Sequence, residues 1–147
     1  MDSSTIPANF MLSIRKEIQI DAPPAVVFES VLDQCGPGFI GMDGKSMNLV
    51  LEAWPGGRWF RDLGNKTGHF WGHVQVIKPP TLLELTGPMF MSYPVISHVQ
   101  YRLTENSGKT TLTMNHRAIG DLAPEHRENV TKGWDHILSR IKERSKR

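Results

Sequence analysis

The sequence predicts an α+β protein in which a curved antiparallel sheet of about seven strands packs against one long C-terminal helix. A strand-like segment comes first and a short amphipathic helix follows it. The middle of the chain then alternates apolar and polar residues between turn signals, and the last part has helical spacing. Strands that follow one another without intervening helices form antiparallel sheets, so a doubly wound parallel sheet is excluded.

The first two predicted elements are a strand at 14–20 and a short helix within 21–34. Ile14, Ile18 and Ile20 fall on one face at a period of two, as in a strand. The next segment, DAPPAVVFESVLDQ, has prolines that a helix tolerates in its first turn, followed by an apolar stripe at helical spacing.

The remaining strands are predicted between Met47 and Ala118. Turn residues separate the extended runs: Pro-Gly-Gly at 55–57, Pro-Pro at 79–80 and the sequence ENSG at 105–108. This spacing predicts about six further strands, each adjacent in the sheet to its neighbours in the sequence.

Alternation assigns the two faces of the predicted sheet. The apolar face collects Phe70, Val74 and Val76, then Val99, Tyr101 and Leu103, then Leu112, Met114 and His116. The intervening residues are polar, as in an antiparallel sheet with one solvated face. The register of 58–63 stays open at this point. Either Trp59, Arg61 and Leu63 face inward, or Arg58, Phe60 and Asp62 do.

The last element is a predicted helix over 124–143. Five apolar residues recur at helical spacing: Val130, Trp134, Ile137, Leu138 and Ile141. This helix has one apolar face and the sheet has another, so we expect the helix to lie in the concavity of the sheet. We expect a single domain over 1–147, with a flexible segment at 1–12 and a fraying end at 144–147.

Composition narrows the classes of function. The net charge of +2 is too small to indicate nucleic-acid binding. The single cysteine, Cys35, excludes an internal disulfide and fits a reducing compartment. No run of about 18 apolar residues occurs, and the first residues lack the pattern of a signal peptide. We therefore expect a cytoplasmic protein without membrane insertion.

A glycine motif, CGPGFIG at 35–41, matches the dinucleotide fingerprint G-x-G-x-x-G. That fingerprint needs a strand before the glycines and a helix after them. Here the glycines follow a predicted helix and precede a loop, so no nucleotide or other cofactor is predicted. His69 and His73 are also too far apart for one metal ion, because four residues of a strand span about 13 Å. No metal is predicted.

Two polar side chains, His116 and Tyr101, fall on the apolar face. They either hydrogen-bond to the backbone or water, or they are polar groups in an otherwise apolar pocket. In such a pocket they could also act as a general acid and base. Cys35 lies in a glycine-rich loop with no base fixed beside it, so a nucleophilic role is not predicted.

Several segments resemble one known superfamily when taken together and in order: IDAPPAVVFESVLD, PGGRW, GHVQVIKPPTLLELT, TTLTMNH and KGWDHILSRI. The chain resembles the START-like helix-grip superfamily (SRPBCC, the birch-pollen-allergen fold) over about residues 14–143. Within it, the chain is similar to the branch named for the activator of heat-shock protein 90 ATPase homologue.

The resemblance implies a seven-stranded sheet that grips the C-terminal helix around a cavity for an apolar or amphipathic small molecule. By the same likeness, Trp134 faces the cavity, and the segments 35–46 and 87–94 border its mouth. Phe39 stands near the place where many relatives have a tryptophan.

The predicted function is binding of a small hydrophobic or amphipathic molecule, without catalysis. The predicted ligand-binding residues are Trp59, Phe60, Phe70, Met89, Phe90, Val99, Tyr101, Leu112, Met114, His116, Trp134 and Leu138. One alternative is a cyclase- or dehydratase-like enzyme that uses His116 and Tyr101 as acid and base. Another is a co-chaperone-like module, whose polar sheet face would dock on a chaperone through His98, Arg102, Arg117 and an exposed Trp71.

Overall fold

The computed structural model describes residues 10–89 and 93–146, and it has the predicted α+β architecture. Its elements in chain order are β1 (Met11–Ile20), α1 (Pro24–Gln34), β2 (Leu49–Leu51), β3 (Arg58–Gly64), β4 (Thr67–Lys78), β5 (Leu82–Gly87), β6 (Val95–Asn106), β7 (Lys109–Gly120) and α2 (Pro124–Arg144). The first strand begins three residues before the predicted one. Phe90 and residues 1–9 lie outside the described part.

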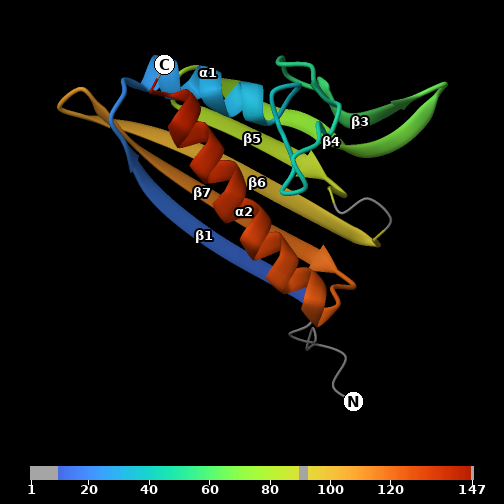
Figure 1. Cartoon of the computed structure of the whole chain (residues 1–147). Helices are drawn as coiled ribbons and strands as arrows, with labels where there is room; N and C mark the ends of the chain where they lie inside the picture. The colour runs from blue at the N-terminus through green and yellow to red at the C-terminus, as the bar shows by residue number, and fades with distance from the viewer. Residues whose placement is uncertain (1–9, 90–92, 147) are drawn as a thin grey trace.

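All seven strands form one antiparallel sheet in the order β1-β7-β6-β5-β4-β3-β2. Strands β2 to β7 form a meander. The first strand, β1, lies at the edge of the sheet and pairs with β7 from Met11↔Ile119 to Ile20↔Thr110. The sheet curves around α2, which crosses it diagonally, while α1 lies across one end (Figure 1). Residues far apart in the sequence thereby meet between α2 and the sheet.

The C-terminal end of α2 is fastened to α1 by a polar network. Arg140 donates to the Gln34 side chain at 2.8 Å, and Arg144 forms an ion pair with Asp33 at 3.0 Å. Near the middle of α2, Asp135 forms an ion pair with Lys16 of β1 at 3.0 Å. These contacts position α2 over the sheet.

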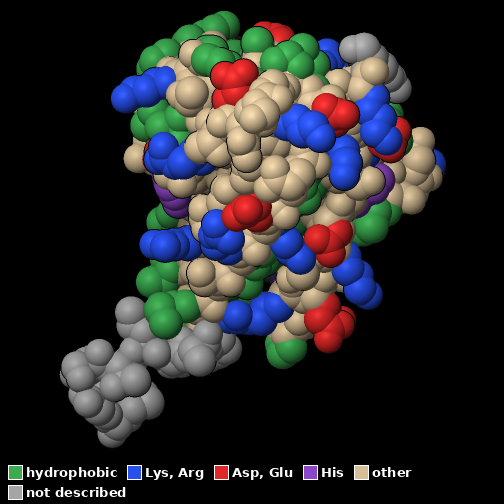
Figure 2. Space-filling view, turned by 90° about the vertical axis from the view of Figure 1, so that its left-hand side faces the viewer, with side chains coloured by type: hydrophobic (Ala, Val, Ile, Leu, Met, Phe, Trp, Pro, Cys, Tyr) green, Lys and Arg blue, Asp and Glu red, His purple; other side chains and the backbone are tan. Residues whose placement is uncertain are grey.

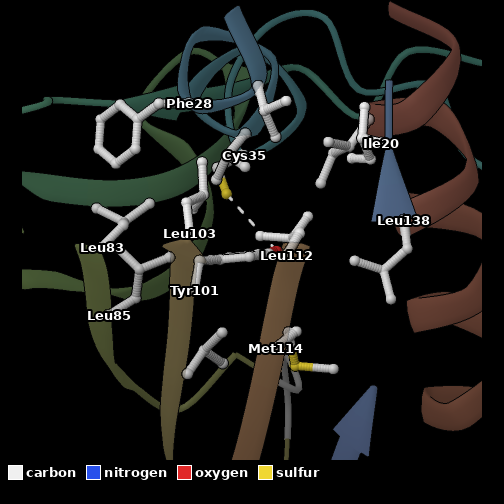
Figure 3. Close-up of a cluster of buried hydrophobic side chains, with 14 of the residues drawn as sticks. Ile20, Phe28, Cys35, Leu83, Leu85, Tyr101, Leu103, Leu112, Met114 and Leu138 are labelled. Atoms are coloured by element: carbon white, nitrogen blue, oxygen red, sulfur yellow. Dashed lines mark hydrogen bonds between the residues drawn. The ribbon is translucent and has the colours of Figure 1, made fainter. Parts of the chain in front are cut away.

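The main core lies between the sheet and the two helices (Figure 3). Residues Val99, Tyr101 and Leu103 of β6 are all buried, and so are the β7 residues Leu112, Met114 and His116. The alternation predicted for these two strands is thus confirmed. From α2, the buried side chains are Trp134, Leu138 and Ile141.

The face prediction for β4 is wrong, because β4 contains two β-bulges. In the pairing with β3, Trp59 is opposite Gly72 and Phe60 is opposite Phe70, so Trp71 is an extra residue. In the pairing with β5, Val74 is opposite Leu85 and Val76 is opposite Glu84, so Gln75 is extra. Each extra residue reverses the alternation. Phe70 is therefore 45% exposed on the outer face, and Val76 does not share the face of the buried Val74.

Of the two alternatives for β3, the structure has the one in which Trp59 points inward. Trp59 is 4% exposed and faces α2. Phe60 follows on the outer face, opposite Phe70, and the Arg58 guanidinium lies 5.1 Å from its ring centre. Leu63 does not continue the inward pattern, because it is 49% exposed.

The surface carries mixed charge on the side shown in Figure 2. Lys and Arg side chains are interspersed there with Asp and Glu, and hydrophobic groups gather toward the top and one edge. Within residues 10–89 and 93–146, no helix is long and apolar enough to cross a membrane.

Candidate functional site

A pocket of about 480 Å³ lies between the sheet and the N-terminal two-thirds of α2. Its floor comes from the inner face of the sheet, including Trp59, Trp71, Tyr101 and His116. Its rim comes from the end of α1 with the loop after it, and from the connection between β5 and β6. None of the described residues that line it is Lys, Arg, Asp or Glu. The pocket is therefore a mainly apolar space with a few polar groups.

One face of α2 supplies the roof of the pocket. The lining residues from this helix are His126, Asn129, Val130, Gly133, Trp134, His136 and Ile137. This spacing places Gly133 at the centre of the face. A Cβ atom built on Gly133 would have no heavy atom within 4 Å, so the missing side chain leaves open space. Glycine in a helix interior costs about 1 kcal/mol relative to alanine, and here it enlarges the pocket.

His116 is fully buried in the floor and held by hydrogen bonds on both ring nitrogens. The Trp134 indole N–H donates to its Nδ1 at 2.8 Å, and its Nε2 lies 3.0 Å from the Ser97 hydroxyl oxygen. An indole N–H only donates, so Nδ1 carries no hydrogen and Nε2–H donates to Ser97. Burial lowers the pKa of His116 from 6.5 to about 4, and the nearby His98 adds to this effect. At neutral pH the ring is uncharged.

The Tyr101 hydroxyl and the Cys35 thiol face each other in the core (Figure 3), and both residues line the pocket. The Cys35 thiol donates to the Tyr101 hydroxyl oxygen across 3.9 Å. Burial raises the pKa of Tyr101 well above 10, so the phenol keeps its proton. The Cys35 carbonyl accepts a hydrogen bond of 2.7 Å from the Trp59 indole, which fixes the loop against β3.

We expect iodoacetamide to alkylate Cys35 at least about a hundredfold more slowly than free cysteine at pH 8, because only the thiolate reacts. Burial raises the pKa of this thiol to about 12. Intact-mass spectrometry over time measures the rate, and the urea-unfolded chain is the control that must react fully. Alkylation of the folded protein at the rate of a free thiol would contradict the burial of Cys35.

Two aromatic contacts join the rim to α2. The rings of Tyr93 and His126 meet edge to face with centres 3.6 Å apart, which links the β5–β6 connection to the start of α2. His136 donates from Nε2 to the Ile40 carbonyl at 2.8 Å and contacts Phe39 edge to face. The rim is thus fixed by side chains of α2 on two sides.

The structure places the predicted site residues in three environments. Those that line the pocket are Trp59, Met89, Tyr101, His116 and Trp134. Val99, Leu112, Met114 and Leu138 belong to the packed core instead. Phe60 and Phe70 lie on the outer face, and Phe90 lies outside the described residues. Trp71, which we expected to be exposed, is half-buried and lines the pocket.

Other lining residues were missed by the sequence analysis. Several of them, including His126, Val130 and Gly133, come from the inner face of α2. The helical spacing of Val130, Trp134 and Ile137 contained this signal, because positions 126 and 133 lie on the same face. Met47 and Leu49 come from an irregular segment and the short strand after it, where no periodicity indicates a direction.

A curved antiparallel sheet that grips a C-terminal helix defines the helix-grip class of START-like (SRPBCC) proteins. A family profile described as Activator of Hsp90 ATPase homolog 1-like protein matches residues 21–146. The chain belongs to this family, which confirms the resemblance predicted from its motifs. No curated protein matches the chain.

Solved structures share the fold at low identity. CalU16 from Micromonospora echinospora has a TM-score of 0.63 and 23% identity, covering 94% of this chain and 76% of CalU16. DynU16, a protein in the dynemicin biosynthetic locus, has a TM-score of 0.63 and 20% identity, covering 93% of this chain but 47% of DynU16. Ara h 8.0201 has a TM-score of 0.66 and 14% identity, covering 92% and 97% respectively.

Proposed function

We propose that this protein binds a small, predominantly apolar molecule in the pocket between α2 and the sheet. The observation that carries this proposal is the pocket itself, with about 480 Å³ of space and no Lys, Arg, Asp or Glu among its described lining residues. Pockets for small molecules usually occupy about 300–1,000 Å³ and have mainly apolar walls with few polar groups. The open space at Gly133 supports the proposal, since an ordinary helix residue there would reduce the space.

The acid–base alternative has less support. Both ring nitrogens of His116 are already hydrogen-bonded within the protein, and the lowered pKa makes this histidine a weak base. The raised pKa of Tyr101 makes its phenol a weak acid. The docking alternative requires an exposed Trp71. This side chain instead contacts Trp59 edge to face, with ring centres 5.1 Å apart.

Replacing Gly133 by leucine is expected to weaken binding of the neutral dye N-phenyl-1-naphthylamine at least about tenfold, because the side chain would occupy the pocket. Gly133→Ala should instead stabilise the fold by about 1 kcal/mol through helix propensity, with a small effect on binding. Dye fluorescence titrations and urea unfolding measure the two effects.

The matched control is Lys132→Leu, which adds the same side chain at an exposed position of the same helix. It should leave dye affinity within about twofold of the natural chain, because surface changes have small effects. Equal dye affinity in Gly133→Leu and the natural chain would place the dye elsewhere and count against the pocket. Absence of dye binding to the natural chain would contradict the proposed function.

A further inference from the structure

The polar groups of the pocket floor differ in how their hydrogen-bonding capacity is used. The indole N–H groups of Trp59 and Trp134 are bound by protein acceptors, at 2.7 Å and 2.8 Å. His116 uses both ring nitrogens, with Trp134 and Ser97. These groups stabilise the walls and have little capacity left for a ligand.

Two floor residues retain donor capacity. In the described part of the chain, the Tyr101 hydroxyl has one hydrogen-bond partner, the Cys35 thiol at 3.9 Å. When that thiol donates to the hydroxyl oxygen, the hydroxyl hydrogen is available to another acceptor. The Trp71 indole nitrogen is buried and has no hydrogen-bond partner among residues 10–89 and 93–146. Both residues line the pocket, and each has an O–H or N–H hydrogen available to a ligand acceptor.

The same walls disfavour an ionised ligand. No Lys or Arg side chain is found among the described lining residues, and His116 is uncharged at neutral pH because its pKa is about 4. A carboxylate beside Tyr101 would lose its hydration and gain no Lys or Arg partner from the described lining, and neutral donors compensate poorly for a charge. A carbonyl oxygen accepts hydrogen bonds and carries no net charge, so it matches the available donors.

We propose that the ligand is an uncharged molecule with a carbonyl oxygen, and that the Tyr101 hydroxyl donates a hydrogen bond to this oxygen while accepting one from Cys35. This inference rests on the proposed function and specifies the chemistry of the ligand. Tyr101 acts here as a binding residue, and no covalent step is involved. The hydrogen bond from the Cys35 thiol helps to orient the Tyr101 hydroxyl.

The test compares two probes of nearly equal shape. 2-Acetylnaphthalene has a carbonyl group where 2-isopropenylnaphthalene has a carbon–carbon double bond. Their dissociation constants are measured with the full chain and with Tyr101→Phe by displacement of N-phenyl-1-naphthylamine. The preference for the ketone over the alkene is the ratio of the two constants, so differences in hydrophobicity cancel between the two proteins.

We expect the preference for the ketone to fall about threefold to tenfold in Tyr101→Phe, the usual contribution of one neutral hydrogen bond. Lys132→Leu, at an exposed position of α2, is the matched control and should keep this preference unchanged. A third probe, 2-naphthoate, should bind the natural chain at least about tenfold more weakly than the ketone.

The outcomes separate the two proposals. If both neutral probes bind and Tyr101→Phe does not change their ratio, the carbonyl inference is overturned and the proposed function stands. If 2-naphthoate binds as tightly as the ketone, the assignment of an uncharged ligand is overturned. If no probe binds the natural chain, the proposed function fails as well.

A second measurement does not depend on the folding of Tyr101→Phe. The infrared carbonyl band of 2-acetylnaphthalene bound to the natural chain should lie at lower wavenumber than in hexane, because a hydrogen bond weakens the C=O bond. A carbonyl band at its hexane position would overturn the inference. Lys132→Leu is the matched control, and its carbonyl band should stay at the lowered wavenumber because the change lies outside the pocket.

Discussion

Replacing Trp134 by alanine should lower the free energy of unfolding by about 3–5 kcal/mol, as for other large buried aromatic residues. This side chain is 4% exposed, and its ring lies edge to face against both Tyr101 and His116, with centres 6.0 Å and 5.5 Å apart. The change removes this packing and also the hydrogen bond to His116 Nδ1.

The phenylalanine variant separates these two contributions. Trp134→Phe keeps an aromatic ring but leaves His116 Nδ1 without its indole donor, which should cost about 1–3 kcal/mol. Urea unfolding followed by circular dichroism measures both variants. Lys132→Ala, at an exposed position of the same helix, is the control and should stay within about 0.5 kcal/mol of the natural chain. A loss below about 1 kcal/mol in Trp134→Ala would contradict the burial of this tryptophan.

The second large effect is on the pH dependence of stability. Because His116 is buried, the free energy of unfolding should fall by about 3 kcal/mol as the pH drops from 6.5 to 4. Folding lowers the pKa of this group from 6.5 to about 4. Between these values the unfolded chain binds a proton and the folded chain does not. Stability from this group is therefore complete above pH 6.5 and is lost as the pH falls to about 4.

His116→Gln isolates this effect from the other titrating groups. At pH 7 the variant should be less stable than the natural chain, because it lacks the hydrogen-bonded ring. Toward pH 4 the difference between the two unfolding free energies should narrow by about 3 kcal/mol, since only the natural chain has the imidazole to titrate. Urea unfolding at several pH values measures the difference. A difference that stays constant from pH 7 to pH 4 would show that the ring titrates alike in both states.

The fold was predictable where local patterns are unbroken. Strands β6 and β7 alternate strictly along their paired length, so their buried residues could be read from the sequence. In β4 the inserted residues Trp71 and Gln75 break the period of two, and no count of alternate positions detects them. One signal was present: a glycine inside a strand often marks a bulge or a close backbone approach. A Cβ atom on Gly72 would lie 2.5 Å from the Thr86 carbonyl oxygen.

The pocket was predictable only in part. Tyr101 and His116 stood out as polar residues on an apolar face, and Trp134 followed from the family resemblance. The residues of the rim depend on the path of the loop after α1, which has no regular hydrogen-bonding pattern to predict it. Gly133 was missed for a different reason: its contribution is an absent side chain, and apolar patterns register only the side chains that are present.

The open space beside Gly133 allows the selectivity for ligands to change while the fold stays intact. Several residues that hold the sheet and α2 together, such as Leu112 and Leu138, lie outside the pocket lining. A single-nucleotide change in the Gly133 codon can introduce a larger side chain. That side chain would exclude bulkier molecules from the pocket and leave the sheet unchanged. Related chains could in this way diverge in what they accept without having to evolve a new scaffold.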